Sequence, residues 1–399
     1  MSEILIFRNQ PEEAYLANNP IVFELRSIIR DLIHYDIVIA GKIIFSGSAM
    51  PAGTSEFDAD IQVSEIISSY MQTSEIDNML SLICSVTNSF INITINFSQG
   101  EETLNFTGKV YPGGIGKKMM RYLKHMTTNI FANKLINTEK QFMLTTRTAG
   151  RHISIKENEL YPLLFIATNK AYTAVTEYGN VFVFPAMTPG ELYAFNPEVL
   201  RRTSFLTYGK LPSFLGILVD GKFVFDIVIL KSDRTPDKLR VRFRNSFAAF
   251  EVIEISGKAT SKTTVTDSSF MRFDSTTYDY TEENNRLSIR DSISAESGYK
   301  SLDEFMFIRD MLQSDKQILI DALGNEYNVR VSSDDFSYDI LPREPGSIRL
   351  NIKVTETDTN YSPEIDESHP EFNFGEAIWE TGITNGYGFL YYNSLLNTI

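Results

Sequence analysis

The sequence predicts a mainly β protein with a few helices, built from antiparallel β-sandwich-like domains in series. Apolar and polar residues alternate over most of the chain, as in FINITINFS (90–98), and this alternation indicates strands that bury one face. Clusters of Gly, Asn, Pro and Ser, such as NNP (18–20), separate these runs. No internal repeat of roughly 20–50 residues is present, which disfavours a solenoid or a propeller.

The first half of the chain predicts an N-terminal β domain over residues 1–112 with one inserted helix. VSEIISSYMQTSEIDNMLSLI (63–83) places apolar residues three and four positions apart, which predicts this helix over about residues 64–84. The strands of the domain are predicted from ILIF (4–7), IVFEL (21–25), YDIVIAGKIIFSG (35–47), FDADIQV (57–63), FINITINFS (90–98) and TLNFTGKVY (103–111).

A second helical pattern, IGKKMMRYLKHMTTNIFANKLI (115–136), is basic on its polar side. It opens a segment over residues 113–205 that we expect to hold this helix and a second set of strands. A C-terminal β domain is predicted over residues 206–355, and residues 356–399 form an acidic linker and an aromatic C-terminal segment.

Three local signals define the predicted C-terminal β domain. VDGK (219–222) lies between apolar runs and predicts a tight hairpin, because Asp-Gly suits a primed turn. Ser301 and Glu304 fit a capping box at the start of a short helix over residues 301–313. KQILIDALGNEYNVRVSS (316–333) predicts two strands around an Asn/Gly turn, and TVTDSSFMRFDSTTYDY (264–280) is rich in Ser, Thr and Asp but still alternates.

Composition excludes several classes of function. A length of 399 residues suits about two or three domains, and 43% hydrophobic with 22% charged residues is typical of a soluble globular protein. The net charge of −14 argues against general binding to nucleic acid or to anionic membrane. The single cysteine, Cys84, excludes an intramolecular disulfide, and its apolar surroundings predict a small core residue.

The residues also predict where the protein is made. MSEILIFRNQPEEAY (1–15) lacks the basic leader and apolar core of a secretory signal peptide. No stretch approaches the ~18 uncharged apolar residues of a membrane-spanning helix. We therefore expect a soluble protein, made in the cytoplasm without membrane insertion, that can be incorporated into a larger particle.

YPGGIGKK (111–118) lies between a predicted strand and a predicted helix, where phosphate-binding loops are found. A P-loop needs Gly five positions before Gly116 and a hydroxyl after Lys117, but the chain has Tyr111 and Lys118 there. The dinucleotide fingerprint fails at Met119. We expect a turn that ends the N-terminal β domain, followed by solvated lysines; its glycines are Gly113, Gly114 and Gly116.

No other motif predicts a catalytic residue, a metal or a cofactor. SSDDFSYD (332–339) lacks the central Gly and closing Glu of a calcium loop, and GSAMPAG (47–53) lacks the spacing of a nucleophile elbow. The histidines have no paired spacing; they are His34, His125, His152 and His369. We therefore expect no enzyme, although 51 acidic residues leave a carboxylate-based glycoside hydrolase as an alternative.

Two sets of residues are candidates for an interaction surface. Arg240, Arg242 and Arg244 share one face of a predicted strand, where they either pair with neighbouring carboxylates or bind acidic groups of a partner. The C-terminal segment carries the aromatic residues Trp379, Tyr387 and Tyr391, which either pack on a neighbouring subunit or stack on sugar rings. The second option is a glycan-binding or adhesin module.

Two further segments resemble a loosely defined group of bacteriophage and prophage tail or baseplate-associated proteins. In RFRNSFAAFEVIEISGKAT (242–260) the matching residues are Arg244, Asn245, Phe247 and Glu251, with Ala248 where that group usually has Gly. In SLDEFMFIRDMLQSDKQILI (301–320) they are Met311, Leu312 and Ser314. The opening segments NPIVFEL (19–25) and GKIIFSGSAMPAGTSEFDADIQVSEII (41–67) are similar in character, so the resemblance covers about half of the chain.

The resemblance implies a non-enzymatic structural protein of a phage-like tail or baseplate that assembles through β-rich surfaces. Its implied partners are copies of itself and neighbouring tail or particle proteins, and host surface glycans are a further candidate. It implies no catalytic residue and no cofactor.

Overall fold

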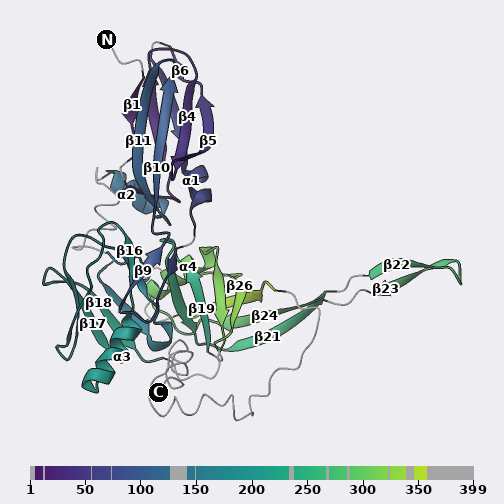
Figure 1. The fold of residues 1–399 in the computed structure, drawn as a ribbon. Helices are drawn as coiled ribbons and strands as arrows, with labels where there is room; N and C mark the ends of the chain where they lie inside the picture. Colours follow the sequence, from purple (N-terminus) through teal and green to yellow (C-terminus); the bar gives the residue numbers. More distant parts are fainter. Residues whose placement is uncertain are drawn as a thin grey trace. The chain divides into compact units, whose positions relative to one another are not determined.

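A computed structural model describes residues 5–11, 14–54, 56–72, 74–125, 142–148, 150–232, 238–266, 269–284, 288–321, 324–337 and 346–356 (Figure 1). Antiparallel sheets dominate these residues, which confirms the mainly β prediction with a few helices. The chain divides into two compact units. The first consists of Met1–Ile153, Pro162–Ile227 and Asn245–Ala249, and the second of Ser154–Tyr161, Val228–Arg244 and Phe250–Ile399.

The first unit begins with a sandwich of two sheets. One sheet has the order β1 (Leu5–Asn9), β3 (Val22–Ser27), β7 (Phe57–Gln62) and β6 (Ala52–Gly53). The other has the order β2 (Ala14–Leu16), β11 (Glu102–Tyr111), β10 (Ile91–Gln99), β4 (Ile33–Ile39) and β5 (Lys42–Ala49). Alternate residues of β10 (Ile93, Ile95 and Phe97) are buried in the core that the two sheets share, as the FINITINFS pattern predicted.

The prediction of a helix over about residues 64–84 is wrong beyond the first turns of that helix. Helix α1 (Ser64–Tyr70) ends early, and the residues that follow form β8 (Glu75–Ile76) and β9 (Ile83–Thr87). Asn78 accepts a hydrogen bond from the Leu80 main-chain N–H at 3.0 Å, which favours a turn over a helix. Pairing of β9 with a neighbouring strand then outweighs the helical spacing of the apolar residues.

The rest of the first unit contains two more sheets. One has the order β13 (Leu163–Ile166), β16 (Leu192–Phe195), β9 and β8, and the other has the order β12 (His152–Lys156), β18 (Lys222–Leu230), β17 (Phe214–Val219), β14 (Tyr172–Thr176) and β15 (Val181–Val183). The rings of Phe165 and Tyr172, from opposite sheets, lie 5.5 Å apart between their centroids. The last residues of β12 and β18 belong to the second unit.

Helix α3 (Pro197–Tyr208) was not predicted, although its boundary residues are typical of a helix. Asn196 caps the first turn by accepting hydrogen bonds from the Glu198 and Val199 main-chain N–H groups, and Pro197 occupies the first position. Gly209 ends the helix in a left-handed conformation.

The second unit is built on a seven-stranded sheet. Its order is β20 (Phe250–Ile255), β19 (Leu239–Arg244), β25 (Gln317–Ile320), β26 (Glu326–Ser332), β27 (Arg349–Val354), β24 (Ser288–Glu296) and β21 (Ala259–Thr266). Helix α4 (Leu302–Gln313) packs on this sheet, and the ring centroids of Phe243 and Phe307 lie 4.9 Å apart. The short 3-10 helix η2 (Glu157–Glu159) also belongs to this unit.

The three local signals of the predicted C-terminal domain are confirmed. β17 and β18 are neighbours joined by Asp220 and Gly221, whose positive φ angles of 50° and 74° are those of a primed turn. Ser301 and Glu304 form the capping box of α4. β25 and β26 pair antiparallel.

The second predicted helix is only partly described. Helix α2 (Lys117–His125) follows the glycine segment, and residues 126–136 of the pattern lie outside the described residues. The division into segments 1–112, 113–205, 206–355 and 356–399 stays a prediction. Across the residues given above, no helix is both long enough and apolar enough to cross a membrane.

Candidate interaction surface

The second unit carries a two-stranded hairpin, β22 (Ser269–Asp274) and β23 (Asp279–Asn284) (Figure 1). Most of its side chains are exposed. In sequence it is inserted between β21 and β24. These two strands pair with each other over eight residues, from Ala259 opposite Ala295 to Thr266 opposite Ser288. β27 pairs with β24 only at Ser292–Glu296, so the part of β21 and β24 nearest the hairpin in sequence is a two-stranded ribbon.

The turn of the hairpin is stabilised by Asp274. Its Oδ1 accepts hydrogen bonds from the Thr276 hydroxyl and, at 2.8 Å, from the Thr276 main-chain N–H. These bonds hold the pKa of the Asp274 carboxyl below its usual value. Tyr278 closes the turn with a φ of 52°, a left-handed conformation that is uncommon for a bulky residue.

One face of the hairpin carries an apolar and aromatic cluster beside the charged Glu282. The register pairs Phe273 with Tyr280 and Met271 with Glu282, so these four side chains point to the same side. The Phe273 ring lies 5.3 Å from the Tyr280 ring and 6.2 Å from the Tyr278 ring, between centroids. Tyr278 is 85% exposed, and Met271 and Tyr280 are each 60% exposed. The aromatic cluster therefore faces water rather than a core.

The other face of the hairpin is mixed. Phe270 is exposed, and Arg272 forms an ion pair with Glu283 at 3.2 Å. Over residues 269–284 the chain has one arginine and four carboxylates, so the hairpin carries a net charge of −3. An isolated two-stranded hairpin is marginally stable in water, and clustered exposed apolar residues often mark a surface that binds another molecule.

The predicted arginine surface lies on β19 and is paired within the second unit. β19 lies between β20 and β25, so it is not an edge strand. Arg242 binds both carboxylate oxygens of Glu326, at 2.8 and 2.6 Å, and Arg240 donates to the Asp321 main-chain oxygen at 3.0 Å. Of the two options, the structure supports pairing with neighbouring groups.

Arg244, the third arginine on this face of β19, forms an ion pair with Asp315. Its Nε donates to Asp315 at 3.0 Å, and a second bond joins Arg244 Nη2 to the same carboxylate. Burial raises the pKa of the Asp315 carboxyl, but the hydrogen bond and charge of Arg244 outweigh it, so that this pKa lies below its usual value.

The YPGGIGKK segment packs closely against Ser246 and Phe247 within the first unit. Gly113 has a φ of 86°, and a Cβ atom there would lie 2.4 Å from the Phe247 carbonyl carbon. The Gly114 N–H donates to the Ser246 oxygen at 2.7 Å, and the Ile115 N–H donates to Asn19 Oδ1 at 2.9 Å. These donors are used within the protein, so they do not form a phosphate cradle. Lys117 and Lys118 are exposed at the start of α2, as predicted.

Cys84 and Tyr111 are buried in the hydrophobic core that also contains Ile115 and Phe247. Burial raises the pKa of the Cys84 thiol to about 11, which fits the predicted core residue and not a reactive thiolate. Burial also raises the pKa of Tyr111 to about 12, and its hydroxyl donates to the Gly190 oxygen at 2.8 Å.

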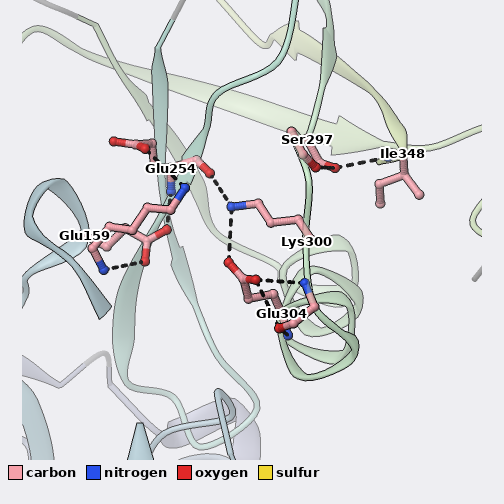
Figure 2. Close-up of polar contacts among 9 residues, drawn as sticks. Glu159, Glu254, Ser297, Lys300, Glu304 and Ile348 are labelled. Carbon is pink, nitrogen blue, oxygen red and sulfur yellow. Dashed lines mark hydrogen bonds and ion pairs between the residues drawn. The ribbon is translucent and has the colours of Figure 1, made fainter. Parts of the chain in front are cut away.

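A cluster of buried charges joins three segments of the second unit (Figure 2). The Lys300 ammonium donates to the Glu254 main-chain oxygen at 2.9 Å and lies 3.5 Å from Glu304 Oε1. The Glu254 carboxylate contacts Lys156 Nζ at 3.4 Å and accepts from Asn158 at 2.9 Å. Glu159 Oε1 accepts from the Glu254 N–H at 2.8 Å. Each of these groups faces another protein group, so the cluster fixes η2 and the start of α4 to β20.

The remaining candidates from the sequence are the C-terminal aromatic residues and possible metal ligands. Trp379, Tyr387 and Tyr391 lie outside the described residues. Within the ranges that the structure describes, no group of three or more His, Cys, Asp or Glu residues could hold a metal ion. The hairpin was not singled out from the sequence, although FMRFDSTTYDY places aromatic residues on both faces of an alternating stretch.

Comparisons with known proteins do not identify the chain. No protein-family model matches it, and no curated protein matches it. Solved structures that align with it include an engineered protein (12% identity, 28% of this chain and 20% of that chain, TM-score 0.18). Another is the neural ectodermal development factor IMP-L2 (10% identity, 57% of this chain and 95% of that chain, TM-score 0.14). A bacterial ice-binding adhesin also aligns (5% identity, 79% of this chain and 91% of that chain, TM-score 0.13). These TM-scores are too low to support an inference about fold or function.

Proposed function

We propose that this chain is a non-enzymatic structural and interaction protein that assembles with other proteins through β-rich surfaces, with the β22–β23 hairpin as its docking element. The observation that supports this proposal is the exposed aromatic face formed by Met271, Phe273, Tyr278 and Tyr280. Burying large apolar and aromatic side chains of this kind contributes much of the free energy of protein association.

The chemistry of the hairpin defines its partner. Its net charge of −3 and its aromatic face fit a protein groove that is apolar at the centre and basic at the rim. The left-handed Tyr278 at the turn supports the same function, because unusual backbone conformations at exposed bulky residues concentrate at binding sites.

The setting in a phage-like tail or baseplate rests on the sequence resemblance over residues 242–260 and 301–320, and the neighbouring particle proteins are its proposed partners. A glycan-binding or adhesin module is the alternative suggested by Trp379, Tyr387 and Tyr391. A glycoside hydrolase is suggested only by the abundance of carboxylates, and no described feature favours it over a docking protein.

Site-specific photo-crosslinking tests the docking function. A photoreactive phenylalanine replaces Tyr278 in the full chain, expressed in the cells that make the protein, and adducts are identified by mass spectrometry after irradiation. We expect one defined adduct with a protein partner, because a docked hairpin holds residue 278 within reach of the groove. The same change at Tyr299, which is 82% exposed outside the hairpin, is the control.

The outcomes of the crosslinking experiment separate docking from its alternatives. A protein adduct from position 278 and none from position 299 supports the hairpin as the docking element. Equal yields at the two positions, or no protein adduct at position 278, would overturn it. If the partner is absent from every particle purified from the same cells, the phage-like setting fails while the docking function stands.

A further inference from the structure

Helix α2 of the first unit lies in a basic stretch of an acidic chain. Residues 103–138 contain six Lys or Arg residues and no Asp or Glu, whereas the whole chain has a net charge of −14. A local excess of one charge attracts oppositely charged partners and speeds their association. The polar side of α2 is therefore a candidate surface for an acidic partner.

The two sides of α2 differ in burial. Met119 and Met120 are half-buried and pack against a hydrophobic core of the first unit. The exposed residues share the opposite side of the helix, because spacings of three and four positions connect them; they are Lys117, Lys118, Arg121 and Tyr122. This exposed side of α2 is anchored to the first unit by the two methionines behind it.

The cations on the exposed side of α2 are available to a partner. Across the described residues, Lys117, Lys118 and Arg121 form no ion pair. By contrast, all three arginines of β19 bond to groups of the second unit. Tyr122, which is 59% exposed, adds an aromatic ring about one turn after Lys118. This side of the helix therefore combines positive charge with an exposed aromatic residue.

The β22–β23 hairpin complements this side of α2 in charge and in chemistry. The hairpin has a net charge of −3, and Glu282 lies on the same face as its aromatic cluster. The Glu282 carboxylate accepts a hydrogen bond from the Ser269 hydroxyl. Carboxylates attract the cations of α2, and Lys and Arg side chains also bind the faces of Tyr and Phe rings. The same chain therefore carries both halves of a complementary pair.

We propose that the hairpin of one copy docks on the exposed side of α2 of a second copy, with Glu282 facing Arg121. Arg121 lies between Lys117 and Lys118 around the helix, because one turn takes about 3.6 residues. This inference rests on the proposed docking function of the hairpin and names its partner. The two surfaces differ, so the contact is head-to-tail and joins copies into a ring or a filament.

Charge reversal in the full-length chain, followed by sedimentation over a concentration series, tests this contact. We expect the parent chain to self-associate, and to do so more weakly at high salt because exposed charges meet. Arg121→Glu and Glu282→Lys should each weaken the association by about tenfold, since each places like charges opposite each other. An equal mixture of the two variants should recover it, because each variant's hairpin then meets a helix of opposite charge on the other.

Lys42→Glu is the matched control for the charge reversals. Lys42 is exposed on β5 and belongs to neither surface, so this variant should associate like the parent chain. Three results overturn the proposal: a parent chain that is monomeric at every concentration, reversals at positions 121 and 282 without effect, or a mixture that does not recover. If Arg121→Glu fails to fold, Lys118→Glu replaces it in the same scheme.

Photo-crosslinking from position 278 separates this inference from the docking function on which it rests. Purified chains labelled with heavy isotopes and carrying the photoreactive phenylalanine are mixed with an excess of unlabelled parent chain. We expect adducts that join a heavy chain to residues 117–122 of a light chain. Adducts within single heavy chains only, or to other residues of the light chain, overturn the second-copy model. An adduct in cells with a different protein alone overturns this model and leaves the docking function standing, whereas no protein adduct overturns both.

Discussion

At the scale of single residues, Ala248 occupies a backbone conformation that favours glycine. Its φ is 61°, in the loop between β19 and β20. Asn245 holds this loop, because its Oδ1 accepts from the Phe247 and Ala249 N–H groups and its Nδ2 donates to the Leu144 oxygen. The Arg/Asn-Phe element of the resemblance is therefore a side-chain-stabilised turn, and the usual Gly at this position has a physical reason.

Ala248→Gly is expected to raise the free energy of unfolding by about 0.5 kcal/mol, because glycine relieves the left-handed strain but loses more chain entropy on folding. Ala249→Gly, at a buried neighbour, should lower it by about 1–2 kcal/mol through loss of a buried methyl group. Urea unfolding of the two variants measures the difference. Shifts of the same sign would contradict the role given to the φ of Ala248.

The environment of Lys300 supports a second quantitative prediction about the free energy of unfolding. Its ammonium is buried between the Glu254 oxygen and Glu304, as Figure 2 shows. Lys300→Met should lower the free energy of unfolding by about 2 kcal/mol, because two charged or polar groups lose their donor. Lys262→Met, at an exposed position of β21, should change it by less than about 0.5 kcal/mol. Thermal unfolding compares the two, and equal midpoints would show that the cluster does not anchor α4.

At the scale of elements, Glu177 joins the end of β14 to the start of β17. Its carboxylate accepts from the Ser213 N–H at 2.8 Å, the Ser213 hydroxyl at 3.0 Å and the Phe214 N–H at 3.0 Å. Burial raises the pKa of the Glu177 carboxyl, but these hydrogen bonds outweigh it and hold the pKa below its usual value. The ionised form therefore stabilises the folded protein.

The sign of this pKa shift sets a pH dependence. Because the folded-state pKa is lowered, the stabilisation is fully present above the unfolded pKa and is lost as the pH falls through the folded pKa. Glu177→Gln should lower the free energy of unfolding by about 1 kcal/mol at neutral pH, and the difference should vanish in acid. Glu101→Gln, at an exposed turn, is the control in a series of unfolding curves. A Glu177→Gln difference that persists at the lowest pH would contradict this account.

Elements with strong local signals could be predicted from the sequence, and those that depend on tertiary pairing could not. The capping box of α4 and the Asp-Gly turn of β17 and β18 are local, and both predictions are confirmed. After residue 70 the helical spacing of the apolar residues predicts a helix that does not form. Instead β9 pairs with β16, which lies more than one hundred residues further along the chain. For α3, the cap signals Asn196 and Gly209 were present, but the apolar alternation around them directed the interpretation toward strands.

At the scale of the whole molecule, the sequence identified the charged candidates for a site but not their pairing or exposure. Arg240, Arg242 and Arg244 share a strand face as predicted, yet their partners Asp315, Asp321 and Glu326 come from about 70–85 residues further along the chain. The hairpin stands out only once burial is known, because periodicity predicts which residues share a face but not what covers that face.

The order of the two units along the chain also constrains how the protein is made. Ser154–Tyr161 of the second unit leaves the ribosome before Pro162–Ile227 of the first, and Asn245–Ala249 completes the first unit only after Val228–Arg244 has been added. Glu159 meets its partner, the Glu254 N–H, 95 residues after its own synthesis. A nascent chain halted before Ala249 thus holds two unfinished cores at once, and neither unit can be obtained whole by a single cut in the sequence.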